Sequence, residues 1–309
     1  MNSSYLFSVQ YLNVTIEDPE FLGWTFYPAA KLFLLITGII FNAACLFLSL
    51  TTPSFRNAFA VYLLAVLSSN LLTLLIYYPL SIIQDLYSQW PLNHALCGVL
   101  LYGNLVSRSL CLHFHGLITL NRYWAILAPL SYRVHHAPAT AVTFCGVSAL
   151  YLHATEVTAI VLDFRLRRWS IEQANCYLDV MAQRVYIGVI YAVNYGVALL
   201  VIAAYPYVLW THVRQKRKVV GAEVQRGAGW GLAITLLTGS VLVCWVPHGI
   251  MMFVLFVREE SAQLTGWEVA WLLNMLQPLL DPLIFFGTVE PVRENLLGRW
   301  RRLRKALAA

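Results

Sequence analysis

The chain consists of long apolar runs separated by shorter polar segments. Each run approaches or exceeds the roughly 20 residues that an α-helix needs to cross about 30 Å of hydrocarbon. The runs lack the every-second-residue alternation of a barrel strand, and backbone amides in lipid must be satisfied within their own segment. The pattern therefore predicts an all-α membrane protein, a bundle of seven transmembrane helices at residues 28–50, 58–84, 95–120, 138–162, 185–211, 229–257 and 267–287.

The composition supports this prediction and narrows the class of protein. Apolar residues make up 59% of the 309 residues, charged residues only 12%, and the mean hydropathy is +0.65. These are too few ionic groups to cover a soluble globule of this size. The two halves show no internal repeat, so a transporter is only a remote alternative. An intramembrane protease would need paired aspartates, a serine–histidine pair or an HExxH helix, and Asp281 is the only aspartate deep in a span, so we expect no enzyme.

The distribution of lysine and arginine predicts the side of the membrane on which each segment lies. With the N-terminus outside, most basic residues fall on the cytoplasmic side, as the positive-inside rule requires. Residues 1–27 then form an extracellular N-terminus, residues 28–287 the transmembrane domain and residues 288–309 a cytoplasmic tail. Residues 299–305 in this tail have the basic and apolar pattern of a short amphipathic helix on the anionic inner leaflet.

The remaining composition signals concern partners and processing. The net charge of +6 is concentrated beside membrane spans, so we expect contacts with membrane lipids and no nucleic-acid partner. Two glycosylation sequons, at Asn2 and Asn13, fall in the segment that the charge rule places outside. No signal-peptide pattern precedes the first span, which is expected to direct insertion. Because the sequence shows no CxxC pair and no histidine–cysteine metal spacing, we expect neither a metal nor a cofactor.

Short motifs occur in a fixed order along the spans. The third span ends in Asn121-Arg122-Tyr123, with Pro129 in the following loop. The sixth contains Cys244-Trp245-Val246-Pro247 and the seventh Asp281-Pro282-Leu283-Ile284-Phe285. Together with Asn42, Asn70, Trp90 and Cys97 at the usual spacings, these motifs resemble the rhodopsin-like (class A) G-protein-coupled receptors. The resemblance implies a plasma-membrane receptor that transmits the binding of an extracellular ligand to heterotrimeric G proteins.

The resemblance also implies roles for individual residues. One outer disulfide would join Cys97 to Cys176, which are also the two cysteines that the topology places on the oxidising side. Arg122, with Asn121, Tyr123 and Pro129, would contact the G protein. The activation switch would comprise Trp245, Pro247, Asp281, Pro282, Phe285 and Tyr205. Pro247 and Pro282 each remove a helix hydrogen bond and would act as joints in their helices.

Several positions depart from the family pattern. Asn121 stands where an acid usually neutralises Arg122, so we expect a weakly stabilised inactive state and raised basal activity. A decoy or scaffold receptor that couples weakly would show the same change. Asn70 replaces the carboxylate that usually anchors a sodium ion, whereas Asp281 supplies a carboxylate across the bundle. With Asn42 and Ser109, these residues predict a polar core that is either a relocated cation site or a structural hydrogen-bond cluster.

The outer half of the third span predicts the chemistry of the ligand. Arg108 lies 14 residues before Arg122 and so returns to nearly the same helix face. A buried guanidinium requires an anionic partner, either Glu156 in the fourth span or an acidic group of a ligand. Asn104 replaces the aspartate of amine receptors, and His248 and Asn274 lie at similar depth. We therefore expect an anionic small molecule or lipid, as in the nucleotide and lipid-mediator branch that the chain weakly resembles.

Overall fold

The computed structural model describes residues 19–52, 57–166, 176–178, 183–207, 209–210, 228–258 and 266–288, with single positions at 294, 298, 301 and 304. The sequons at Asn2 and Asn13 and most of the tail lie outside these ranges, and of the predicted amphipathic helix only Arg301 and Arg304 are described, both helical and exposed. Their roles and the predicted boundaries at residues 27 and 288 stay predictions.

The described residues form the seven expected helical spans. The observed elements are α1 (Phe26–Thr51); α2 (Ala58–Leu72), η3 (Thr73–Tyr77) and α3 (Tyr78–Leu86); α4 (His94–Tyr102), η4 (Gly103–Ser107) and α5 (Arg108–Leu127); α6 (Pro129–His135); α7 (Pro138–Leu166); α8 (Arg184–Ile190), η6 (Tyr191–Gly196) and α9 (Val197–Ala203); α11 (Ala228–Arg258); and α12 (Trp267–Met275) with α13 (Gln277–Thr288). Six spans are continuous, and α12 with α13 forms a bent seventh. The predicted fold is therefore confirmed.

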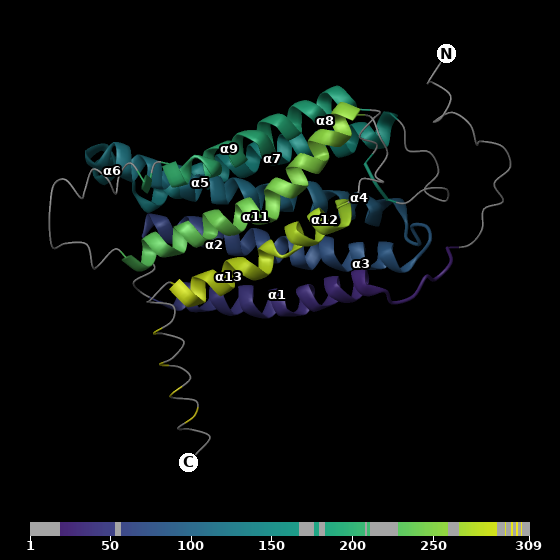
Figure 1. Cartoon of the computed structure of the whole chain (residues 1–309), viewed down its shortest axis with the longest axis horizontal. Helices are drawn as coiled ribbons and strands as arrows, with labels where there is room; N and C mark the ends of the chain where they lie inside the picture. Colours follow the sequence, from purple (N-terminus) through teal and green to yellow (C-terminus); the bar gives the residue numbers. More distant parts are fainter. Residues whose placement is uncertain are drawn as a thin grey trace.

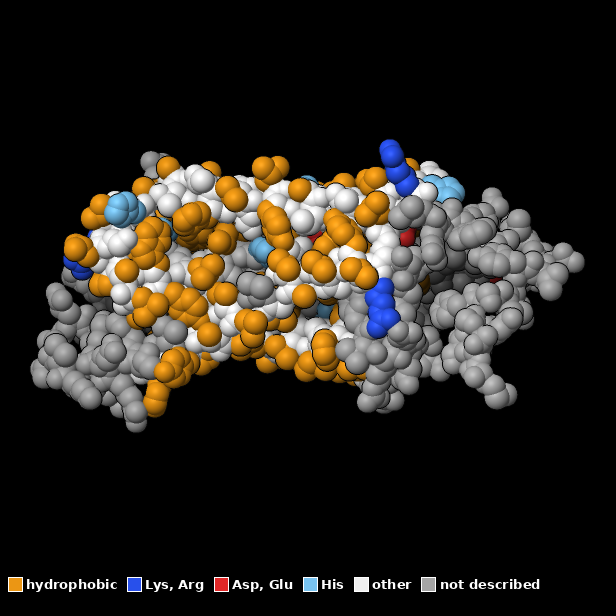
Figure 2. All heavy atoms as spheres, turned by 90° about the horizontal axis from the view of Figure 1, so that it is seen from above, with side chains coloured by type: hydrophobic (Ala, Val, Ile, Leu, Met, Phe, Trp, Pro, Cys, Tyr) orange, Lys and Arg blue, Asp and Glu red, His pale blue; other side chains and the backbone are white. Residues whose placement is uncertain are grey.

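The spans lie side by side along the long axis of the bundle (Figure 1). The short helix α6 lies at one end, whereas α4 and α12 lie at the other (Figure 1). Within its apolar window the third span is 67% buried and the fourth only 22%, which places the third span at the centre of the bundle. On the face shown in Figure 2, apolar side chains cover the flank and the described lysines and arginines lie only toward the ends. Such a flank is suited to lipid.

Three spans contain a π-helical segment that the sequence pattern did not predict. η3, η4 and η6 interrupt the second, third and fifth spans. η3 and η4 pack together at Gly103, where an added Cβ would lie 3.0 Å from the Tyr77 amide nitrogen and 3.1 Å from its Cα. Glycine at this position therefore permits the close approach of the two segments. η4 ends immediately before Arg108, and π-helical turns are frequent at functional sites.

The seventh span bends at a different place from the one expected. The break between α12 and α13 lies at Leu276 with a bend of 40°, whereas α13 continues through Pro282. Pro282 has no amide hydrogen to donate to the carbonyl of Pro278, four residues earlier. That carbonyl instead accepts from the Asn42 side chain at 2.5 Å. The Tyr78 hydroxyl likewise donates to the Met275 carbonyl at 2.5 Å, so side chains of the first and second spans satisfy the interrupted backbone.

The outer disulfide is present. Cys97 in the first turn of α4 is bonded to Cys176, with a Cα–Cα separation of 5.7 Å. The bridge ties the segment after the fourth span to the outer end of the third. At the outer ends of the first two spans, the backbone of Leu22 donates to the carbonyl of Leu86 at 2.8 Å, and Lys31 forms an ion pair with Asp85 at 2.5 Å. These contacts join the outer ends of the first and second spans to each other.

Candidate functional site

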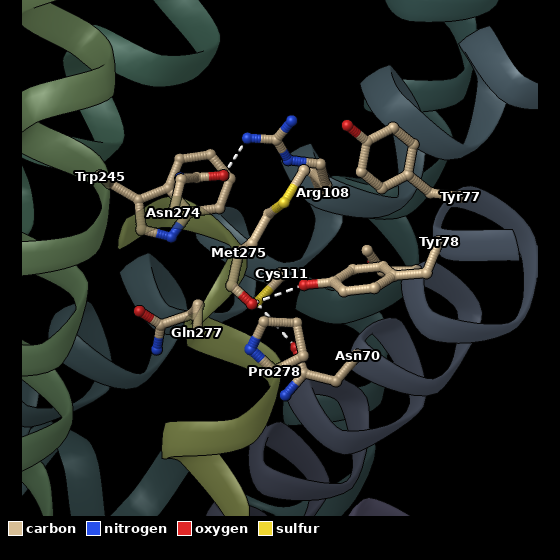
Figure 3. Close-up of a pocket in the computed structure, with 11 residues that line it drawn as sticks. Asn70, Tyr77, Tyr78, Arg108, Cys111, Trp245, Asn274, Met275, Gln277 and Pro278 are labelled. Carbon is tan, nitrogen blue, oxygen red and sulfur yellow. Dashed lines mark hydrogen bonds between the residues drawn. The ribbon is translucent and has the colours of Figure 1, made fainter. Parts of the chain in front are cut away.

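Arg108 lies at the centre of a polar site in the outer half of the bundle. It begins α5 directly after η4 and is 6% exposed. Its guanidinium donates to the Asn104 side-chain oxygen, one turn earlier, at 2.6 Å. It also donates to the side-chain oxygen of Asn274 on α12 (Figure 3). The structure therefore brings together three of the five predicted pocket residues.

Aromatic rings from three spans surround the same guanidinium. Its central carbon lies 4.5 Å from the ring centre of Trp271 and 5.6 Å from those of Tyr77 and Trp245. These distances are within the range of cation–π attraction. His248 packs its ring edge-on against Trp271 at 4.9 Å, and among the described residues neither of its ring nitrogens has a hydrogen-bond partner. His248 therefore lies next to the site and contacts Trp271, which in turn contacts Arg108.

Glu156 has different partners from Arg108. Its carboxylate accepts from the Ser109 hydroxyl at 3.0 Å and from the Asn194 amide at 2.9 Å. The ion pairs among the described residues are Lys31–Asp85 and His115–Asp281. The internal pair between Arg108 and Glu156 that the sequence left open is therefore not formed. Successive helix residues point about 100° apart, so Ser109 faces the fourth span while Arg108 faces the seventh.

The predicted polar core forms around Asp281. The Asp281 carboxylate accepts from Asn70 at 2.9 Å and from Gln277 at 2.5 Å. It lies 3.0 Å from Nε2 of His115, and Asn70 is 3.3 Å from the Asn42 side-chain oxygen. All these groups are buried. Asn42, Asn70 and Asp281 therefore lie together.

Ser109 does not belong to this core, which corrects the expectation. Its hydroxyl contacts Glu156 and Tyr195, each at 3.0 Å. Cys111, two residues later and so about 200° around the helix, faces the core instead, with its sulfur 3.1 Å from the Asn70 side-chain oxygen. Cys111, Gln277 and His115 also belong to the core, although the sequence pattern did not predict them there. The available signal was the spacing of four residues from Cys111 to His115 and from Gln277 to Asp281.

A small cavity joins the Arg108 site to the polar core. Its walls include Arg108, Trp245 and Asn274 at one end and Asn70, Cys111 and Gln277 at the other (Figure 3). A ligand group held at Arg108 would therefore lie above Trp245 and close to the residues that surround Asp281.

Of the predicted switch residues, Trp245 lines this cavity, whereas Tyr205, Asp281 and Phe285 are buried outside it. Trp245 is 2% exposed and packs against Tyr195, with ring centres 5.7 Å apart, two residues before Pro247 inside α11. Tyr205 and Phe285 are members of one buried apolar cluster. The Tyr123 hydroxyl donates to the Val201 carbonyl at 2.6 Å, and its ring centre lies 6.3 Å from that of Tyr205. The third and fifth spans are thus linked near Arg122.

The predicted G-protein contact lies at the end of α5, next to α6. The Arg122 guanidinium packs 4.5 Å from the ring centre of Phe59. Its Nε and both amide atoms of Asn121 are buried without a hydrogen-bond partner among the described residues. Pro129 is the first residue of α6. Outside the spans, burial and the nearby Arg122 charge lower the pKa of His136, whose ring contacts the Tyr62 hydroxyl at 3.2 Å.

The sequence was also compared with known proteins. Residues 41–285 match the family described as 7 transmembrane receptor (rhodopsin family). Proteinase-activated receptor 2 of Mus musculus is 24% identical over 94% of this chain and 74% of its own length. The RYamide receptor of Tribolium castaneum is 23% identical over 78% of this chain and 70% of its own length. The histamine H2 receptor of Rattus norvegicus is 23% identical over 78% and 69%, respectively.

Proposed function

Because the chain belongs to the rhodopsin family of seven-transmembrane receptors, we propose that it is a plasma-membrane receptor that responds to an extracellular ligand with an acidic group and activates heterotrimeric G proteins. Its N-terminus lies outside the cell and its C-terminus inside, as the positive charges predict. The single observation that carries the ligand class is the Arg108 guanidinium, which is buried and has no carboxylate partner among the described residues.

Physical chemistry favours an anion at this position. A cation in the interior of a membrane protein needs compensation, and amide oxygens with aromatic faces provide only part of it. A carboxylate or phosphate could accept two parallel hydrogen bonds from the guanidinium if the ligand displaced Asn104 and Asn274. The remainder of such a ligand would contact Tyr77, Trp245 and Trp271, which supply the apolar surface of the site.

The acidic group could belong to a lipid or to a peptide, and one experiment separates the two sources. Cells that express the receptor are given a long-chain fatty acid, a lysophospholipid with a phosphate monoester and peptides with a free C-terminal carboxylate. Each is paired with a neutral ester or amide. The proposal predicts a response to one acid that is lost with its neutral partner and in Arg108→Gln. An equal response to the neutral partner, or an unchanged response in Arg108→Gln, would contradict it.

A receptor that binds a ligand without signalling is a second candidate function. The observation that favours it is Asn121, whose amide has no partner among the described residues and does not contact Arg122 as a carboxylate would. Such a change alters the resting state of the inner end of α5. A decoy would bind the acidic ligand through Arg108 but would produce no G-protein response in any arm of the experiment.

A further inference from the structure

We infer that Cys111, His115 and Asp281 form a binding site for a divalent transition-metal ion, with zinc the best match, between the third and seventh spans. This inference goes beyond the proposed function and needs no assumption about the ligand or the G protein. The ligating atoms that the three side chains offer lie within 4.8 Å of one another, and all three residues are buried.

The geometry requires only small movements to coordinate a metal. Tetrahedral zinc, with bonds of about 2.0 Å to nitrogen or oxygen and about 2.3 Å to sulfur, holds its donor atoms roughly 3.3–3.6 Å apart. Nε2 of His115 and Oδ1 of Asp281 are 3.0 Å apart. The Asn70 oxygen, 3.1 Å from the Cys111 sulfur, is in position to supply the fourth donor. The Cys111 sulfur lies 3.7 Å from Nδ1 of His115, so the sulfur must move toward Nε2 for all the donors to share one ion.

The orientation of His115 suits a metal ligand. Its Nδ1 lies 2.9 Å from the backbone carbonyl of Cys111, to which it can only donate. This hydrogen bond fixes the tautomer that leaves a lone pair on Nε2, the arrangement by which histidine ligands are commonly oriented. In the metal-free protein a proton must lie between Nε2 and the Asp281 carboxylate, because otherwise two acceptors would face each other. A metal ion would take the place of that proton.

The charges and the donor types select the ion. A thiolate at Cys111 and the carboxylate of Asp281 together carry the charge that neutralises a divalent cation, which matters in a low-dielectric interior. Sodium, magnesium and calcium prefer oxygen donors, whereas thiolate and imidazole together favour zinc and its neighbours in the first transition series. Gln277 already donates to Asp281 at 2.5 Å and would hold the carboxylate in place as an outer-shell partner.

A metal at this position would join two spans that meet through hydrogen bonds. Cys111 and His115 lie one turn apart on α5, and Asp281 lies on α13. Coordination would couple the centre of the third span to the half of the seventh span beyond the bend. The bound ion is therefore expected to raise the thermal stability of the receptor.

Cobalt is the appropriate probe because its thiolate complexes have a charge-transfer band in the near ultraviolet. The full-length receptor, purified with an affinity tag that contains no histidine, is titrated with Co²⁺ and then with Zn²⁺. We expect one tightly held cobalt ion per receptor, a thiolate band, and loss of the band when zinc is added. Cys111→Ser should abolish the band, whereas Cys145→Ser, which removes a free cysteine on α7, should leave it unchanged.

Two results would overturn the inference. In the first, the wild-type receptor shows no thiolate band. In the second, the band persists in Cys111→Ser. If Cys111→Ser cannot be purified, zinc X-ray absorption of the wild-type receptor decides the question. A coordination shell with one sulfur and otherwise nitrogen and oxygen supports the site, and a shell without sulfur contradicts it. Neither measurement uses a ligand or a G protein, so its outcome is independent of the proposed function.

Discussion

The third span carries two arginines with unusual neighbours, Arg108, which is buried, and Arg122, which is half-buried. Arg108 is held by amide oxygens and aromatic faces, and Arg122 packs against Phe59. Neither forms an ion pair among the described residues. We therefore assign ligand binding to Arg108 and a weakly stabilised resting state to Arg122.

The first prediction concerns Asn121. Replacing it by aspartate would place a carboxylate next to Arg122, and a charge-assisted hydrogen bond contributes about 1–3 kcal/mol. Since about 1.4 kcal/mol is a tenfold change in population, Asn121→Asp should lower ligand-independent signalling several-fold at equal surface level. Asn121→Leu serves as the uncharged control and should not lower it. If Asn121→Asp signals like the wild type, the resting state is held elsewhere.

A second prediction separates Arg108 from Glu156. Because the two side chains have different partners, Arg108→Gln should leave surface expression near normal, and adding Glu156→Gln should change expression only by the amount that Glu156→Gln causes alone. Surface expression by flow cytometry measures all four receptors. An expression defect in Arg108→Gln that Glu156→Gln corrects would show that the two charges compensate each other after all.

At the element scale, the bent seventh span depends on side chains from its neighbours. Two backbone carbonyls near the bend, those of Met275 and Pro278, accept from Tyr78 and Asn42. Side chains of neighbouring spans therefore satisfy the interrupted backbone, which has no lipid partner for its hydrogen bonds. This explains why an asparagine is needed in the first span, opposite a proline of the seventh.

A double-mutant cycle tests this explanation. Asn42→Leu should destabilise the purified receptor by about 1–3 kcal/mol, because it leaves a buried carbonyl without a donor. In a Pro282→Ala background the new amide hydrogen can donate to Pro278 itself, so Asn42→Leu should cost markedly less. Thermal unfolding of the four receptors measures the coupling. Equal costs in the two backgrounds would exclude the carbonyl of Pro278 as the reason for Asn42.

The contact between η3 and η4 gives a further prediction about the packing of the spans. Gly103→Ala would place a methyl group against the Tyr77 backbone, which cannot move as a side chain does, and should destabilise by about 1–3 kcal/mol. Gly146→Ala on α7 is the matched control, since an added Cβ there meets no atom within 4 Å. Thermal unfolding should therefore distinguish the two substitutions, and equal stability would show that the close approach is unimportant.

The extent of these elements followed from the sequence, because a helix in lipid requires a continuous apolar run of defined length. The directions of the side chains were harder to predict from the sequence. The neighbours of Ser109 and Cys111 differ because the two residues that separate them turn the helix by about 200°, and the chain contains a π-helical segment just before them. Which carbonyls lack donors near Leu276 depends on tertiary contacts, so the place of the bend was not predictable from Pro282 alone.

At the scale of the whole molecule, the outer disulfide ties the segment at Cys176 to the outer end of the third span. Cys97 and Cys176 form one bond, so replacing either should lower surface expression or ligand response by a similar amount. Replacing both should be little worse than replacing one. Surface labelling of the two single variants and the double variant measures this, and additive losses would mean that each cysteine acts separately.

We propose that this receptor activates G proteins through the inner end of its third span. The most direct measurement is ligand-free second-messenger output in cells, recorded for each G-protein family, for the wild type and for Arg122→Ala at equal surface level. We expect output above that of cells without receptor in at least one family, and its loss in Arg122→Ala. Output no higher than in cells without receptor, or equal output from the wild type and Arg122→Ala, would contradict the account.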